Sequence, residues 1–491
     1  MGLISLLRIH LGIIKKTDAI EATRAALQKE YDEYNEYAKS KELARYLELK
    51  EFVSSPDFAL RKKEIMRQKF SSTAEYSKQQ RYLELKKKPR IKTYLAVSNS
   101  QQLQACKTIE QSAELKEYIG LEQYLHSNEF LQLQASMPSK EFKQHESYQK
   151  VLRHKELSNS SALKNYHKFI QSENYKIYTE MADSAEVKEY FELEKYLAGD
   201  AFLKVRDYMA LSASKKWEAS DEYAKLTEYK TLYKSEKIRW YFSLEGTHKF
   251  DEIKRWKMTF EDDFNQAKLS PQWLTKYYYG ETIIKDTYSL FNDQHFVTDG
   301  ANLSIGNSML KIITQKNNKP VEGKAWHAKN GFYTRSFEYT SGLINTGKAF
   351  RQKYGRFEVK AKLNKSASVT HTGYLLGNSA LPQINLFKSG KNILSVGMYQ
   401  GMLAKGKVKK SCSPFLSKRF TNDYYLFAIE WTPGKIIWKI NDLVAHTINT
   451  NLAEPLYLSF GSGIYTKNVD ESTLPVTLDI DWVRCYEETT N

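Results

Sequence analysis

The residues most informative about chemistry are three polar side chains in one short run. Gln383 and Asn385 lie two positions apart, and Lys388 follows three positions later. Residues two apart on a β-strand point to the same face of the sheet, so the two amides share a face. Lys388 has the opposite parity and joins that face only if a β-bulge adds a residue, a feature common beside functional sites.

These side chains favour binding over proton transfer. The amides of Gln383 and Asn385 donate and accept hydrogen bonds but do not ionise. The ammonium of Lys388 has a reference pKa of about 10.4, so it is a poor proton donor at neutral pH unless burial lowers that pKa strongly. Such a site can hold a neutral or an acidic ligand without supplying a nucleophile.

Gln383, Asn385 and Lys388 need β-strands to hold them in place. The alternation of apolar and polar residues predicts such strands throughout the second half of the chain. From about Trp256, short runs of alternating apolar and polar residues are separated by Gly, Asn, Asp and Ser. Clear examples are 309–314, 425–433 and 436–442. Many short alternating strands with turn signals predict an antiparallel sandwich or barrel.

The order of several motifs within 256–488 resembles glycoside hydrolase family 16, the laminarinase and lichenase type of β-glucanase. The matching runs are MTFEDDF, YTSGLINT, YGRFEVKAKL, HTGYLLG, LPQINLFK, IEWTP, PLYLSFG and DIDWVRCY. The resemblance implies a β-jelly roll, a two-sheet sandwich of the concanavalin A-like class with a sugar-binding face. The expected fold is therefore multidomain, with an all-β jelly-roll sandwich in the C-terminal half.

The resemblance also places three acids of the family in the pattern E-x-D-x-x-E. By that resemblance, Gln383 stands at the position of the nucleophile, Asn385 at that of the assisting Asp and Lys388 at that of the acid/base. A retaining glycosidase needs two carboxyl groups about 5–5.5 Å apart. We therefore expect a catalytically degenerate domain, a pseudoenzyme, that binds a β-glucan or a related polysaccharide.

Four further residues are candidates for contacting the sugar by the same resemblance: Tyr374, Trp326, Asn345 and Arg356. A fifth candidate, His371, is a polar group near the site that departs from the family's usual run. The two aromatic residues offer flat faces for a sugar ring, and the other three offer hydrogen-bonding groups. For the aromatic residues, packing between the sheets is an equally weighted alternative.

Two other functions stay open for the sandwich. One is an active endo-β-glucanase that hydrolyses O-glycosidic bonds with an altered site, and the other is a scaffold that binds no glycan. Whether the domain is an enzyme is left undecided, with inactivity as the expectation. No metal or cofactor is predicted; some family members bind a structural calcium ion, but no compact acidic loop supports one here.

The first half, residues 1–250, is expected to be an all-α helical repeat region. Segments that begin at Glu42, Glu114 and Glu186 share one pattern of apolar and charged residues and lie 72 residues apart. Apolar residues recur at intervals of three and four, which indicates amphipathic helices. A looser half-repeat begins at Ala162. An α-solenoid and a string of helical bundles both fit, as a spacer or as a docking arm for a protein partner or a glycan.

Composition limits the partners and leaves the compartment open. The chain has 491 residues and a formal net charge of +16, but Lys and Arg are interspersed with Glu in the first half. This arrangement is typical of solvated helix faces, so we expect no nucleic-acid binding. Residues 1–16 predict an amphipathic helix rather than a clear signal peptide, and no membrane span is expected. A cytoplasmic location is the default expectation.

Overall fold

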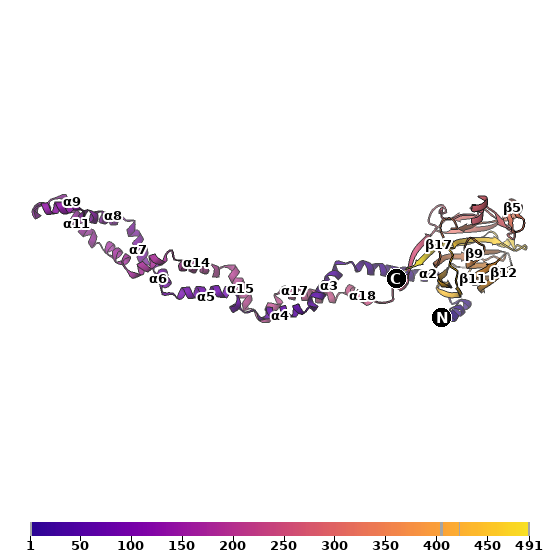
Figure 1. The fold of residues 1–491 in the computed structure, drawn as a ribbon, viewed down its shortest axis with the longest axis horizontal. Helices are drawn as coiled ribbons and strands as arrows, with labels where there is room; N and C mark the ends of the chain where they lie inside the picture. Colours follow the sequence, from indigo (N-terminus) through magenta and orange to yellow (C-terminus); the bar gives the residue numbers. More distant parts are fainter. Residues whose placement is uncertain (1, 403–405, 422, 490–491) are drawn as a thin grey trace. The chain divides into compact units, whose positions relative to one another are not determined.

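The computed structural model describes residues 2–402, 406–421 and 423–489. Helices extend to Arg255, and strands follow from β1 (Trp256–Asp262) to β17 (Val476–Glu488) (Figure 1). The expected fold class, helical repeats followed by an all-β sandwich, is confirmed. The compact units divide the chain differently, because the residues up to Ser40 group with those from Trp240 onward, and Lys41–Arg239 form the second unit. The expected 1–250 region therefore contributes its first helices to the unit that contains the sandwich.

The second unit is a run of short helices that goes out and returns. Each outgoing helix packs on a returning one, and the pairs are α3 with α17, α4 with α16, α5 with α14, α6 with α13, α7 with α12 and α8 with α11. The outgoing helices are α3 (Lys41–Ser54), α4 (Pro56–Arg67), α5 (Ala74–Lys87), α6 (Pro89–Ser98), α7 (Gln101–Glu110) and α8 (Ala113–Leu125). The returning helices are α11 (Glu146–Asn159), α12 (Ser161–Ile170), α13 (Glu173–Met181), α14 (Ala185–Leu197), α16 (Ala213–Glu218) and α17 (Asp221–Tyr233). This unit is an antiparallel ladder of helix pairs, which corrects both expected arrangements, the solenoid and the string of bundles.

One contact repeats along the ladder and explains the sequence period. In α5 and α14, Arg81 forms an ion pair with Glu189 at 2.8 Å, and the rings of Tyr82 and Tyr190 stack at 5.0 Å. The same pairing recurs elsewhere, as Arg45 with Glu228, Tyr46 with Tyr229, Arg153 with Glu117 and His154 with Tyr118. The contact positions 45, 81, 117, 153 and 189 are 36 residues apart, so the 72-residue period contains two structural repeats.

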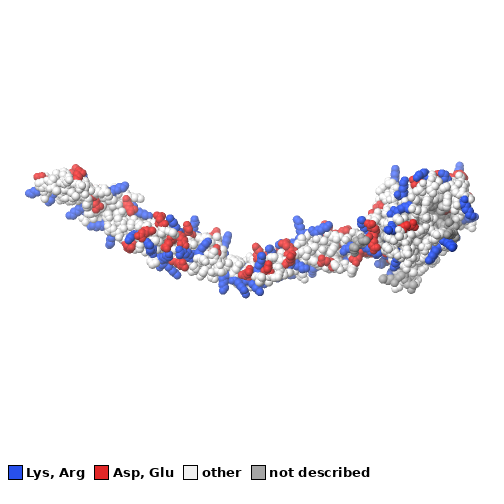
Figure 2. Space-filling model, in the orientation of Figure 1, with Lys and Arg blue, Asp and Glu red and all other residues white. Residues whose placement is uncertain are grey.

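Serine residues at the helix starts keep the helices short. Ser112, for example, accepts a hydrogen bond from the backbone N–H of Leu115 at 3.2 Å, which caps the first turn of α8. On the visible face of this unit, Lys and Arg side chains are interspersed with Asp and Glu (Figure 2). That surface is the solvated helix face expected from the sequence.

The other unit contains a sandwich of two mainly antiparallel sheets. The large sheet has the strand order β15-β14-β13-β8-β17-β5-β6-β3, and the small sheet has the order β12-β11-β10-β9-β16-β7. Strands of the large sheet include β3 (His295–Val297), β5 (Leu310–His327), β6 (Gly331–Ser341), β8 (Gly355–Leu363), β13 (Tyr425–Thr432), β14 (Gly434–Ile440) and β15 (Leu443–Thr450). Two short strands, β2 (Ser289–Leu290) and β4 (Leu303–Ile305), pair with β5. The small sheet consists of β7 (Leu343–Asn345), β9 (Val369–Leu376), β10 (Gln383–Gly390), β11 (Ile393–Met402), β12 (Lys407–Leu416) and β16 (Tyr457–Ile464).

The core lies between the two sheets and leaves one face of each sheet outside it. Phe357, Phe387, Trp431, Trp438 and Phe460 are fully buried there. The helix α1 (Gly2–Leu11) packs against β15, while α2 (Thr17–Tyr37) lies on the outer face of the large sheet. The small sheet keeps its outer face, called the open face below, for polar side chains. Within the described residues, none of the helices combines the length and apolar character that a membrane span requires.

Candidate functional site

The three polar residues of the 383–388 run gather on the open face of the small sheet. Asn385 lies opposite Gly397 of β11, and Lys388 lies opposite Ser395, so three steps on β10 match two steps on β11. The extra residue is a β-bulge, and it turns Lys388 to the same face as Gln383 and Asn385. The bulge expected from the sequence spacing is confirmed.

Hydrogen bonds fix the two amides. Gln383 Nε2 donates to Asn385 Oδ1 at 2.7 Å. The backbone carbonyl of Asn385 accepts a bond from Trp438 Nε1 at 2.8 Å, and Trp438 belongs to β14 of the large sheet. This bond ties the site strand to the opposite sheet through the core. Asn385 is 1% exposed, whereas Gln383 and Lys388 are half-buried, so the Gln383 amide and the Lys388 ammonium are the more accessible groups. No carboxyl group is among these three side chains.

Tyrosine residues surround the amides on neighbouring strands. Tyr374 of β9 is the cross-strand partner of Asn385, and Tyr399 of β11 is that of Gln383. Burial raises the pKa of the Tyr374 phenol, so the group keeps its proton and can donate a hydrogen bond. Farther along the sheet, Tyr457 of β16 is 3% exposed, and its ring centroid lies 5.5 Å from that of Tyr278, which belongs to the segment before β2. The face thus combines aromatic surfaces with a few oriented polar groups, which is the usual composition of a sugar-binding surface.

Asn345 lies on β7, the edge strand of the small sheet, whereas Trp326 lies on β5 of the large sheet. Trp326 is 39% exposed on β5, and its cross-strand partner Phe332 contacts the ring of Tyr288 at 5.3 Å. Asn345 is buried in β7, where Nδ2 donates to the carbonyl of Lys276 at 2.7 Å and Oδ1 accepts from the N–H of Gly347 at 3.1 Å. The amide of Asn345 therefore already holds two loops together.

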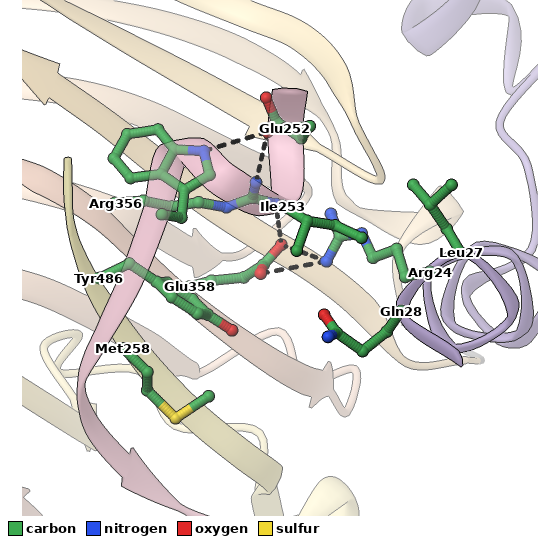
Figure 3. A pocket seen from close by; sticks show the side chains of 10 residues that line it. Arg24, Leu27, Gln28, Glu252, Ile253, Met258, Arg356, Glu358 and Tyr486 are labelled. Carbon is green, nitrogen blue, oxygen red and sulfur yellow. Dashed lines mark hydrogen bonds and ion pairs between the residues drawn. The ribbon is translucent and has the colours of Figure 1, made fainter. Parts of the chain in front are cut away.

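Arg356 and His371 lie away from the amides, which corrects their expected places. Arg356 is on the outer face of the large sheet, where it lines a pocket of about 400 Å³ with Glu358 and Arg24 (Figure 3). His371 points into the sandwich, where its Nε2 donates to the carbonyl of Asn364 at 2.8 Å and its Nδ1 pairs with Ser462 Oγ at 2.9 Å. Strand parity alone could not show which face of β9 is the buried one.

Stability is expected to fall between about pH 6.5 and pH 4 because of His371. Burial lowers the pKa of the 2% exposed His371 ring to about 4, whereas an unfolded histidine has a pKa of about 6.5. The unfolded chain therefore binds the proton first, and stability that is complete above the unfolded pKa is lost as the pH falls toward the folded pKa. The loss amounts to about 3 kcal/mol. Urea unfolding across this pH range would measure it, and His371→Gln should flatten the pH profile. If the free energy of unfolding depended on pH equally in the parent chain and in His371→Gln, His371 would not be the cause of the loss.

Two residues of the open face were missed by the sequence reasoning. Tyr399 and Lys410 lie on β11 and β12, and each is the other's cross-strand partner. The alternation of side chains along a strand does not show which residues of neighbouring strands lie side by side. The register between β10 and β11 is what places Tyr399 beside Gln383. In the part of the chain that the structure describes, no group of three or more His, Cys, Asp or Glu side chains could hold a metal ion.

Comparison with known families identifies the sandwich. Residues 290–484 match the model of glycosyl hydrolases family 16. The C-terminal half of the chain therefore contains a glycoside hydrolase family 16 domain, as the motif order indicated.

Curated relatives share this domain at low identity. Endo-1,3-1,4-beta-glycanase EglC of Rhizobium meliloti (strain 1021) is 22% identical over 249 residues, which are 46% of this chain and 51% of the relative. Glucan endo-1,3-beta-glucosidase A1 of Niallia circulans is 22% identical over 288 residues, 50% of this chain and 39% of the relative. The chain thus spans about half the length of the first relative and less of the second.

Two solved laminarinase structures are also similar to part of this chain. The laminarinase catalytic domain from Thermotoga maritima MSB8 is 19% identical, with a TM-score of 0.39, and the match covers 48% of this chain and 100% of that chain. The laminarinase from Rhodothermus marinus is 18% identical, with a TM-score of 0.38, and the match covers 48% of this chain and 98% of that chain.

Proposed function

We propose that the family 16 domain binds a β-glycan on the open face of the small sheet and does not hydrolyse it. The observation that carries the proposal is the convergence of Gln383, Asn385 and Lys388 on one face, with no carboxyl group among them. The motif frame assigns these positions to the nucleophile, the assisting acid and the acid/base. The two relatives are named as an endo-beta-glycanase and a glucan endo-beta-glucosidase, which supports a β-glycan as the ligand class.

The missing carboxyl groups account for the absence of turnover. Loss of general acid/base catalysis alone typically costs ~10²–10⁴-fold in rate. Here the nucleophile of a retaining mechanism is lacking as well, because an amide at position 383 does not ionise. Binding needs neither group, since amides and tyrosines recognise sugar hydroxyls and ring faces.

The helical ladder is proposed to act as a scaffold for this domain. Its repeated ion pairs and stacked rings join the outgoing and returning helices along its length. A protein partner for the ladder is the alternative that its extended surface supports.

Calorimetry and a reducing-end assay on the same samples test the proposed function. We expect saturable binding of a β-glycan from a panel of β-1,3-glucans, mixed-linkage glucans and sulfated galactans, without new reducing ends. Gln383→Ala should weaken binding about tenfold, because it removes hydrogen bonds to the sugar. The control variant Gln104→Ala, on an exposed position of the helical ladder, should bind normally.

Each other outcome selects a different function. New reducing ends that disappear with Gln383→Ala would show a hydrolase with an altered site. If no glycan of the panel were bound or cleaved, the remaining function would be that of a scaffold that binds no glycan.

A further inference from the structure

Two lysine ammonium groups each lie within about 6 Å of the ring centroid of Tyr399 on the open face. Lys388 Nζ lies 5.8 Å from the centroid of the Tyr399 ring, and Lys410 Nζ lies 5.5 Å from it. The three residues come from the neighbouring strands β10, β11 and β12. Because Tyr399 is also the cross-strand partner of Gln383, the two cations border the amides of the proposed binding site.

Neither ammonium has a carboxylate partner among the described residues. The described strands of the small sheet contain no Asp or Glu at all. Lysines of the large sheet differ in this respect; Lys360, for example, forms an ion pair with Asp481 at 2.7 Å. The open face therefore carries positive charge that the fold leaves without a counter-charge.

One of the two ammonium groups, that of Lys388, is also partly removed from water, whereas Lys410 is exposed. Burial lowers the pKa of Lys388, and the neighbouring charge of Lys410 lowers it further. Holding two like charges near one ring costs free energy, and that cost falls when an anion binds between them. A neutral glycan would leave this cost in place.

An anionic sugar fits the arrangement. A sulfate ester or a carboxylate accepts hydrogen bonds from both ammonium groups, and such charge-assisted bonds are stronger than bonds between neutral groups. The ring of Tyr399 offers a flat surface for the sugar that carries the anion, and Gln383 can bond to its hydroxyls.

We infer that the glycan bound by the open face is anionic, and that its sulfate or carboxylate group binds between Lys388 and Lys410. The inference rests on the proposed function and specifies its ligand class. Both lysines are binding residues in this arrangement.

Matched pairs of ligands test the charge requirement. One pair is a sulfated β-galactan oligosaccharide and its desulfated form, and the other is an oligouronate and its carboxyl-reduced form. Calorimetry should show at least about tenfold tighter binding of the charged member of one pair. That affinity should fall as the ionic strength rises. The pair that shows the difference identifies the anion as sulfate or carboxylate.

Variants locate the charge on the protein. Lys388→Met and Lys410→Met should each remove most of the preference for the charged ligand, so that the charged and uncharged members bind each variant with similar affinity. Lys409→Met is the matched control, because the exposed Lys409 is adjacent in sequence and points to the other face of β12. Thermal unfolding of each variant checks that the fold is retained.

The outcomes separate the inference from the proposed function. Binding of a neutral glycan with equal affinity for the charged form would overturn the inference and leave the proposed function intact. If Lys409→Met and Lys410→Met lost the preference for the charged ligand to the same extent, the inference would be overturned as well. Failure to bind any member of either pair or of the glucan panel would overturn both.

Discussion

A variant with Gln383→Glu, Asn385→Asp and Lys388→Glu is expected to release reducing ends from the β-glycan that the parent chain only binds. The bulge in β10 already places all three side chains on the open face. A carboxylate at 383 could attack the sugar, and a carboxyl group at 388 could protonate the leaving oxygen. We expect a rate at least ~10²-fold above the background of the parent chain, the lower bound for general acid/base catalysis. The substrate for the assay is the uncharged form of the ligand found by calorimetry, because a carboxylate at position 388 would repel an anionic group on the sugar.

The matched control moves one acid to the other face of the sheet. Gln383→Glu and Asn385→Asp combined with Lys409→Glu add the same three carboxyl groups but retain Lys388 at the site. This variant should stay inactive, as should Lys388→Glu alone, which lacks a nucleophile. A folded and glycan-binding triple variant that releases no reducing ends would show that positions 383–388 are not a catalytic frame in this domain.

Removal of the Glu358 carboxylate is expected to destabilise the sandwich by ~3–5 kcal/mol, the usual cost of breaking a buried ion pair. Glu358 is 2% exposed and accepts hydrogen bonds from Arg24 Nη1 at 3.0 Å and from Arg356 Nη2 at 2.9 Å (Figure 3). Arg24 comes from α2, and Arg356 and Glu358 come from β8. Glu358→Gln would remove the most buried counter-charge of the two guanidinium groups and leave them the more exposed Asp442 and Glu252.

The pH dependence of this site has a definite sign. Burial by itself raises the pKa of Glu358, but the charges of Arg356 and Arg24 outweigh it and hold the pKa below its usual range. The site therefore contributes its full stability above the unfolded pKa of about 4.3 and loses it as the pH falls through the lower folded pKa.

Urea unfolding at neutral pH measures the effect, with Glu261→Gln as the control. Glu261 forms an ion pair with Arg484 at 2.8 Å on the exposed surface, so its loss should cost only ~0–1 kcal/mol. Equal losses in the two variants would show that the Glu358 cluster does not hold α2 on the sheet.

Local sequence patterns were sufficient to predict much of the site strand. Alternation on 383–388 placed Gln383 and Asn385 on one face and required a bulge for Lys388, and the register shows both. The helical periodicity of the first half was equally readable, because amphipathic periodicity depends on residues only a few positions apart. The sequence also showed directly that positions 383, 385 and 388 carry no Asp or Glu.

Tertiary pairing decided the rest. The sequence could not bring Lys410 and Tyr399 beside Gln383, nor turn His371 inward, because alternation gives two faces of a strand but does not say which one packs. Likewise, helix periodicity does not specify the partner helix, so the ladder and the docking of α2 on the sandwich appeared only in the structure. The residue types at the site were determined locally, whereas its neighbours depend on contacts between residues far apart in the chain.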